Sequence, residues 1–352
     1  MKLFDTKTAQ VLLTCLVFAL GLFFIYTAWR AVLTFLFAIF FAYLLEAPVN
    51  RLQRWMRGSR MGAIAVVYLV LITGITLLFT FAGPPVVQEA RTLMQQAPKW
   101  ASEISSGDIV RNVGAHRGWS DETQDRILSF LTDHRQDVIT ATQNLAVRAI
   151  NSFQNVWWLL LVPILAIFFL KDGRSFGDAI INSVQDQRNR QVVSDTVEEM
   201  NHMLGGFIRS QLLLAALAMV VITLVIWAMG VPYAFAVGPA AGALEFIPVV
   251  GPIIGIALIM GVGFFSNYHH LLGLFLFLLA WRGIQDYISS PRILGRHLSL
   301  HPLAVLFGVL AGGEVAGVIG VFLSIPVLAT LRILWHSLKL HRKTSTHPRA
   351  PA

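Results

Sequence analysis

The chain has 352 residues, of which 56% are hydrophobic and only 13% are charged. Soluble domains carry about 25% charged residues, so this composition argues against a soluble enzyme. The 27 Lys and Arg outnumber the 19 Asp and Glu, an excess typical of proteins that meet nucleic acid or an anionic membrane surface. Cys15 is the only cysteine, which excludes a disulfide framework and a cysteine-based metal site.

The first third of the chain begins with apolar runs of membrane-spanning length. A helix needs about 20 apolar residues to cross the bilayer, and three runs approach this length: Val11–Trp29, Ala31–Leu45 and Gly62–Gly83. We therefore predict three transmembrane helices over residues 1–84.

Residues 85–155 have a different character. They contain seven basic and eight acidic side chains and no run long enough to cross a membrane. Apolar residues recur at helical spacing, so we predict amphipathic helices broken near SSGD and HRGWS. The segment is interpreted as a water-exposed helical insert that packs on itself or on a neighbouring subunit; ligand binding is the alternative.

Two more apolar runs, Val156–Leu170 and Leu212–Met229, predict transmembrane helices within residues 156–230. Between them, residues 171–211 form a polar, amphipathic segment that we expect on the cytoplasmic side. Its stretch Asp195–Ile208 is expected either along the membrane face or packed beneath the bundle. Residues 339–352 form a basic tail.

Residues 231–338 are predicted to be a transport core with interrupted helices. Fifteen of the 27 glycines lie between positions 230 and 326, and Glu245 and Glu314 each stand among small residues. Irregular backbone at membrane depth needs protein or a watery cavity to satisfy its polar groups. We therefore predict re-entrant helical hairpins over residues 233–265 and 303–325; two full crossings are the alternative. The residues assigned to these breaks and hairpins are Pro248, Gly251, Pro252, Pro291, Pro302, Gly312, Gly313, Gly317, Gly320 and Pro326.

The distribution of basic residues favours the hairpins. Cytoplasmic loops are enriched in Lys and Arg, and only the hairpin arrangement places Arg292 and Arg296 in the cytoplasm together with both termini. A topology anchor is the simpler role for Arg292; attraction of an anionic or hydroxylated solute is the other.

Two membrane carboxylates are the first candidates for transport chemistry. A buried acid is costly and commonly binds a cation, relays a proton or pairs with a base, which makes Glu245 and Glu314 candidates, with helix capping as the structural alternative. Asp286 stands four residues after Arg282, a spacing that allows an ion pair on one helix face.

Other motifs limit the function classes. The chain has no phosphate-binding loop and no His-Glu-x-x-His sequence, so we expect neither ATP-driven transport nor an enzyme, and no metal or cofactor. Its basic residues are spread over several loops, which argues against nucleic-acid binding. Within residues 230–326, four Gly-x-x-x-Gly pairs fit either packing within the chain or a homo-oligomer interface.

Three sequence features resemble the autoinducer-2 exporter family of membrane permeases. They are the Glu-x-Ile-Pro-x-x-Gly-Pro string at residues 245–252, the series Asp286, Pro291, Arg292, His301 and Pro302, and the glycine-rich string from Gly312 to Pro326. The resemblance implies a multi-spanning transporter of the bacterial cytoplasmic membrane. Within the family, some members are associated with export of autoinducer-2 and others with exchange of Na⁺ or Li⁺ for H⁺.

Together these patterns predict an all-α polytopic membrane protein with about six to eight transmembrane helices and a helical insert. The predicted function is a secondary permease that exports a small polar solute such as autoinducer-2. The alternatives are Na⁺(Li⁺)/H⁺ antiport and, in another class, a membrane scaffold that acts through its insert.

Overall fold

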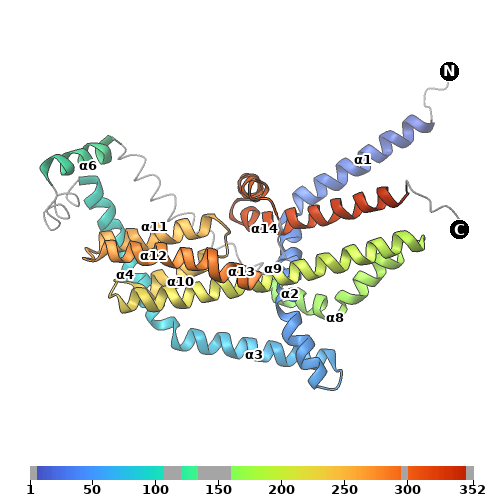
Figure 1. Ribbon diagram of the computed structural model, residues 1–352, viewed down its shortest axis with the longest axis horizontal. Coiled ribbons are helices and arrows are strands. Elements are labelled where there is room, and N and C mark those ends of the chain that lie inside the picture. Colours follow the sequence, from blue (N-terminus) through green and yellow to red (C-terminus); the bar gives the residue numbers. More distant parts are fainter. Residues whose placement is uncertain (1–5, 107–119, 134–159, 295–299, 346–352) are drawn as a thin grey trace. The chain divides into compact units, whose positions relative to one another are not determined.

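The computed structural model describes residues 6–106, 120–133, 160–294 and 300–345 (Figure 1). These residues form helices joined by short turns and contain no strand, which confirms the predicted all-α class. The elements are α1 (Thr6–Thr27), α2 (Trp29–Trp55), α3 (Arg60–Phe81), α4 (Gly83–Ser106), α6 (Asp121–Asp133), α8 (Leu161–Asn182), α9 (Gln187–Ala228), α10 (Ala234–Leu244), α11 (Val250–Phe265), α12 (Leu271–Ile284), a π-helical turn (Gln285–Ser289), α13 (Ser290–Leu294) and α14 (Pro302–Ser345).

Helix length and apolarity support a multi-pass membrane protein. In the described part of the chain, five helical stretches are long and apolar enough to cross a membrane, within residues 29–55, 60–81, 189–228, 271–293 and 303–337. Shorter apolar helices cover residues 10–21, 234–244 and 250–265. The expected span at 156–170 is described only from residue 160 onward, where α8 follows.

The chain divides into two compact units. The first comprises residues 1–67 and 153–176. Within it, the Arg60 guanidinium at the start of α3 donates to the Leu170 carbonyl of α8 (2.6 Å) and to the Asn50 side chain of α2 (3.3 Å). Phe35 of α2 meets Phe169 of α8 edge to face, with ring centroids 6.1 Å apart. Arg60 and this aromatic pair therefore join the three helices.

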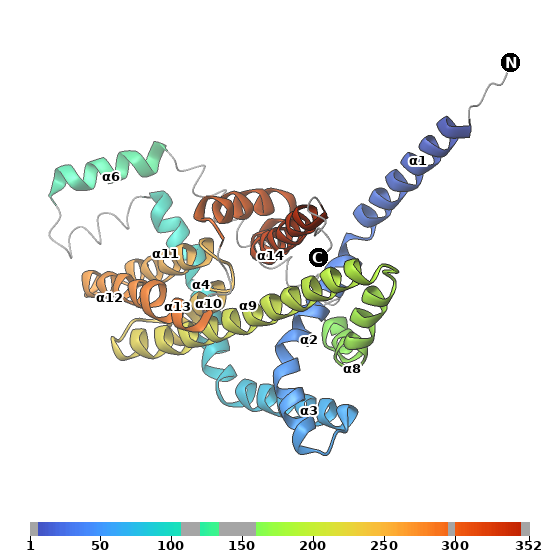
Figure 2. The same ribbon diagram turned by 45° about the vertical axis from the view of Figure 1, so that its right-hand side comes forward.

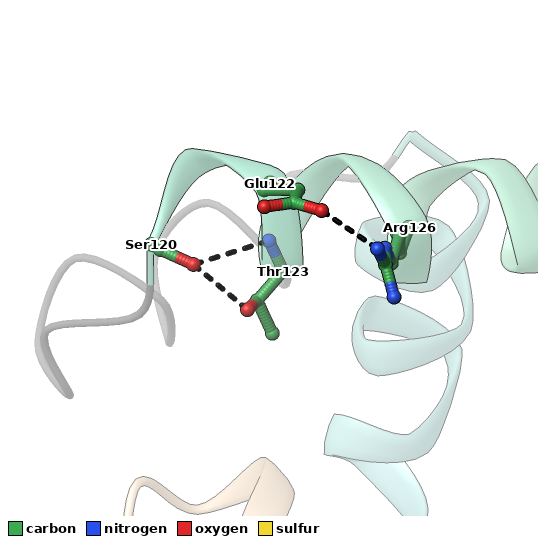
Figure 3. Close-up of polar contacts among 4 residues, drawn as sticks. All are labelled: Ser120, Glu122, Thr123 and Arg126. Carbon is green, nitrogen blue, oxygen red and sulfur yellow. Dashed lines mark hydrogen bonds and ion pairs between the residues drawn. The ribbon is translucent and has the colours of Figure 1, made fainter.

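The second unit comprises residues 68–152 and 177–352 and contains most of the predicted insert. The described parts of the insert are helical, as expected: α4 ends at Ser106, and α6 begins directly after Ser120. The Ser120 hydroxyl accepts from the Thr123 N–H (3.4 Å), and Arg126 pairs with Glu122 (2.6 Å; Figure 3). A serine before the first turn caps the free N–H groups of a helix, which explains why α6 starts there. The predicted apolar positions beyond residue 133, up to 155, lie outside the described residues.

The core of this unit is built by α9, α10, α11 and α12, which lie side by side in Figure 1. Its buried side chains include Ile226 of α9, Val237 of α10, Ile259 of α11 and Leu274 of α12. The Tyr268 hydroxyl, in the turn before α12, donates to the Met229 carbonyl at the end of α9 (2.8 Å). One side of this unit therefore gathers four helix ends. They are the end of α9, the start of α10, the end of α11 and the start of α12; the start of α10 and the end of α11 are the outer ends of the α10–α11 pair.

Glycines allow α10 to approach α9 closely. A Cβ atom added to Gly238 would meet the Thr223 backbone, and one added to Gly242 would meet the Met219 backbone. Gly255 of α11 likewise faces Ala241 of α10. Small residues at this spacing let helix backbones pack in contact, so these Gly-x-x-x-Gly positions serve packing within the chain.

Helix α14 contains the second break. Non-helical backbone angles occur at Ala316 and at Gly317, where φ is +58° and ψ is −141°, a conformation that favours glycine. The two arms on either side of this bend pack together, because a Cβ on Gly312 would meet the Gly320 carbonyl and one on Gly308 would meet the Leu328 side chain. Figure 2 shows the bend.

The polar segment 171–211 continues into a membrane-spanning helix. Its residues from Gln187 onward are the first half of the 42-residue helix α9. This half packs against the second arm of α14: Met203 clusters with Ala329 and Ile333, and the Thr196 and Ser337 hydroxyls are 2.7 Å apart. Thr196 and Met203 of this segment therefore contact the second arm of α14.

The close α9–α10 contact predicts the effect of a single methyl group. Gly242→Ala would push α10 away from Met219, and overpacking of this kind costs about 1–3 kcal/mol of unfolding free energy. We expect a lower melting temperature in detergent micelles than for Gly261→Ala, whose added Cβ has open space. Equal melting temperatures for the two variants would contradict the close contact.

Candidate functional site

The candidate site lies at the break between α10 and α11, residues 245–249. Val249 adopts a positive φ of 67°, and Pro248 cannot donate a backbone hydrogen bond. The eleven residues of α10 rise about 16 Å from its outer end, roughly half the ~30 Å hydrocarbon layer. The tip of this broken pair is thus about half a bilayer thickness away from the side on which the helix ends gather.

The opposite wall of the site is a modified helix. α12 continues without interruption through the π-helical turn Gln285–Ser289 into α13. A π-helical turn inserts an extra residue into a helix and frequently marks a functional position. In this chain it begins four residues after Trp281 and carries Gln285 and Asp286.

Three charged side chains meet between these two walls. The guanidinium of Arg282 contacts Asp286 through two nitrogens (2.6 and 2.9 Å) and lies 3.6 Å from the Glu245 carboxylate. The Glu245 side chain is only 10% exposed, against 32% for Arg282 and 44% for Asp286. The predicted Arg282–Asp286 pair is therefore confirmed, and it orients the arginine that faces the buried acid. With all three groups ionised, the cluster carries one net negative charge.

Two glutamines complete the polar lining. The Gln211 amide of α9 donates to the Glu245 backbone carbonyl (2.7 Å), and Gln285 lines the same cavity as Glu245. Gln285 itself is only 2% exposed. Glu245 is thus held at its backbone by Gln211 and at its side chain by Arg282, both on neighbouring helices.

A cavity of about 210 Å³ adjoins this cluster. It is lined by polar groups from α9, the break and α12–α13, together with apolar side chains: Gln211, Leu214, Glu245, Pro248, Val249, Pro252, Arg282, Gln285 and Ser290. Small-molecule sites usually measure about 300–1,000 Å³ and combine apolar walls with a few placed polar groups. This cavity has that character at the size of a small solute.

The structure gathers only some of the residues chosen from the sequence. Glu245, Asp286, Pro248 and Pro252 lie at the cluster or line the cavity, and Gly251 packs against the Leu244 carbonyl across the break. Glu314 is exposed, precedes the bend of α14, and forms no hydrogen bond or ion pair with any described residue. Arg292 is exposed on α13 and does not line the cavity.

The other predicted break positions are distributed along α13 and α14. Pro291 is the second residue of α13, and Pro302 opens α14, where a missing N–H costs nothing. Gly312, Gly313 and Gly320 flank the bend at Gly317, and Pro326 lies inside the second arm. Phe322 of that arm contacts Phe246 at the α10–α11 tip, with ring centroids 6.2 Å apart.

This broken-helix core and the rest of the chain match one protein family. The profile of the AI-2E family transporters covers residues 12–339. The chain belongs to this family. The family consists of membrane permeases, and the resemblance noted in the sequence is confirmed.

Curated relatives within the AI-2E family are distant but nearly full-length. The chain is 26% identical to the putative transport protein YrrI of Bacillus subtilis (86% of this chain, 85% of the relative). It is 25% identical to the AI-2 transport protein TqsA of Escherichia coli (86% and 84%) and 26% identical to the putative permease PerM of Escherichia coli (95% and 94%).

Sequence reasoning missed several residues of the site in this AI-2E family chain. Gln211 and Gln285 are uncharged and lie in apolar helices, so only their polarity at membrane depth could have singled them out. Glu89 and Trp100 of the insert helix α4 were also missed: Glu89 accepts from the Ala236 N–H at the start of α10 (3.0 Å), and Trp100 stacks on Phe265 at the end of α11. The insert thus contacts both outer ends of the hairpin.

The His, Cys, Asp and Glu side chains are scattered over the described part of the chain. No group of three His, Cys, Asp or Glu side chains converges there. Among the described acids, the carboxylates of Glu245 and Asp286 are joined through an arginine. The arrangement can pair charges, take up a proton or cation, and donate hydrogen bonds to a solute.

The three-charge cluster predicts a non-additive mutational response. Arg282→Gln leaves the half-buried pair of carboxylates without its counter-ion and should lower the free energy of unfolding by roughly 1–3 kcal/mol. Adding Glu245→Gln should restore part of that loss, because the double variant no longer buries an unpaired carboxylate.

Unfolding in detergent micelles would measure the four members of this cycle, with Arg292→Gln as the control for losing an exposed arginine nearby. Strictly additive effects of the two substitutions would contradict the interaction between Arg282 and Glu245.

Proposed function

We propose that the chain is a secondary carrier that moves a small polar solute through the cavity at the α10–α11 tip. The observation that supports this most directly is the position of that cavity. It combines a broken helix, a buried carboxylate and an arginine at about half a bilayer thickness from the gathered helix ends. Broken helices that present backbone and polar side chains near the midplane are the usual sites of secondary transporters.

The lining of the cavity favours a solute that is small and rich in hydrogen-bonding groups. Arg282 and Gln211 supply donors, Glu245 supplies an acceptor, and Ser290 can do either. Autoinducer-2 export is the first candidate activity, since the relative TqsA carries the name AI-2 transport protein.

Exchange of Na⁺ or Li⁺ for H⁺ is the second candidate. Its support is electrostatic: Glu245, Arg282 and Asp286 together carry one net negative charge when ionised. A net charge within a bilayer is costly, and uptake of a monovalent cation or a proton would neutralise the cluster. The exchange would then alternate the two ions at one site.

We place the protein in the bacterial cytoplasmic membrane with both termini in the cytoplasm. In this orientation, Arg292 and the basic residues after position 338 lie inside, as the enrichment of Lys and Arg in cytoplasmic loops requires. The gathered ends of α9–α12 and the insert then lie on the outer side, and the cavity lies between them and the cytoplasm.

Flux measurements in proteoliposomes test the proposal. We expect the purified chain to carry autoinducer-2 or another small hydroxylated solute faster than protein-free vesicles, and Glu245→Gln to reduce the rate at least tenfold. Glu314→Gln is the matched control, since it removes the same charge from an exposed position outside the cavity.

Two sets of flux measurements separate solute export from cation/proton exchange. The first measures the flux of polar solutes with and without a proton gradient, and the second measures the flux of Na⁺ or Li⁺ driven by a pH difference. If no solute and no cation crosses faster than in empty vesicles, the carrier function is wrong. A loss in Glu314→Gln as large as in Glu245→Gln would place the critical acid at the second break instead.

A further inference from the structure

A second, smaller cavity lies beside the transport cavity. Its volume is about 10 Å³, which is close to the space that one water-sized group occupies. Its walls include Trp281, Ile256 and Leu278, and it shares Glu245, Pro252, Arg282 and Gln285 with the larger cavity. The two cavities are therefore neighbouring compartments of one site.

Two buried polar atoms on the walls of this compartment have no partner among the described residues. They are the indole Nε1 of Trp281 and the amide Oε1 of Gln285. The Trp281 nitrogen can only donate a hydrogen bond, and the Gln285 oxygen can only accept one. The two residues stand four positions apart on the helical span that forms one wall of the site, which places them on the same side of it.

The environment explains why the Gln285 oxygen is left over. Gln285 and Glu245 line the same cavity, but an ionised carboxylate only accepts hydrogen bonds, so Glu245 cannot satisfy the Gln285 oxygen. With 2% of the residue exposed, bulk water does not reach it. Buried polar atoms without partners are rare, and each one calls for a specific explanation.

A hydroxyl is the simplest chemical group that satisfies both atoms at once. A hydroxyl group donates to an acceptor and accepts from a donor, so it can bridge Gln285 Oε1 and Trp281 Nε1. A bare cation would suit the Gln285 oxygen but would meet the positive end of the indole N–H. A carboxylate would suit the indole but would add negative charge next to Glu245.

We propose that Trp281 and Gln285 form a hydroxyl-recognition subsite of the transport cavity, so that the substrates are uncharged hydroxylated solutes. This inference rests on the proposed carrier function and deepens it. A hydroxyl in the subsite could belong to the solute or to a resident water molecule, and the experiment below separates these two sources.

The test compares solutes that differ by one hydroxyl group. The full-length protein is reconstituted into proteoliposomes, and rates are measured for a panel of four- to six-carbon polyols and sugars, each with its deoxy analogue, for example ribose and 2-deoxyribose. We expect the wild type to show a KM at least about tenfold lower for the hydroxylated member of the best pair.

Trp281→Phe removes the indole donor and keeps an aromatic ring, and Gln285→Met removes the acceptor at similar length. We expect each variant to bring the KM ratio of the pair close to one by raising only the KM of the hydroxylated solute. Trp227→Phe, on the exposed face of α9, should leave the ratio unchanged.

The possible failures are distinguishable. In one outcome, the wild type carries hydroxylated solutes while Trp281→Phe and Gln285→Met still distinguish them from their deoxy analogues. In that case Trp281 and Gln285 do not bind the solute's hydroxyl group and instead hold a resident water molecule, while the carrier function stands. The same conclusion follows if both variants weaken the two members of a pair equally. If the wild type carries none of the hydroxylated solutes and moves cations instead, both the subsite and the solute-export function are wrong.

Discussion

The arrangement of α9–α12 depends on satisfying the backbone at the break between α10 and α11, which the proposed carrier function sets inside the membrane. Lipid offers no hydrogen bonds, so free N–H and C=O groups at this depth must find partners in the protein. The Ile247 N–H donates to the Leu244 carbonyl (2.8 Å), and the Gly251 N–H donates to the Ile247 carbonyl (2.9 Å). Gln211 supplies a donor for the Glu245 carbonyl. Tight turns and one glutamine therefore make an interrupted helix tolerable.

The same requirement explains why the neighbouring helices approach so closely. Gln211 reaches the break only because α10 lies directly on α9, where Gly238 and Gly242 face backbone atoms. Gly251 allows the start of α11 to return past the Leu244 carbonyl. Away from the break, Glu89 of α4 contacts the start of α10, and Trp100 of α4 contacts the end of α11. Small residues thus bring polar side chains within reach of the broken backbone.

The charged cluster gives the break a chemical role. Arg282 is oriented by two contacts to Asp286 and stands next to the more deeply buried Glu245. The pairing lowers the cost of burying the acid but leaves one net negative charge, which a proton, a cation or the hydrogen bonds of a solute can offset. A solute or ion that binds here would compete with the contacts of Arg282 to Glu245 and Asp286. Because these contacts hold the α10–α11 tip, binding in the cavity is linked to the conformation of the tip.

Much of this arrangement could be predicted from the sequence, because local chemistry determines it. Glycine and proline mark the α10–α11 break, glycine marks the bend of α14, and the four-residue spacing specifies the Arg282–Asp286 pair. The positions of Gln211, Gln285 and Glu89 could not be predicted, since each lies next to residues on a helix distant in sequence. The exposure of Glu314 depends on where the arms of α14 separate. Both acids stand among small residues in the sequence, but Glu245 is buried in the structure and Glu314 is exposed.

Cysteine accessibility tests most directly whether water enters the membrane at the broken helix. In a Cys15→Ser background, Val249→Cys would line the cavity, whereas Ile253→Cys, one turn further along α11, is 65% exposed but lies outside the cavity lining. With the protein in vesicles, we predict that a charged thiol reagent modifies Val249→Cys and leaves Ile253→Cys unmodified, and that a transported solute slows the reaction. Equal modification of both positions, or of neither, would contradict a water-filled site at the α10–α11 tip.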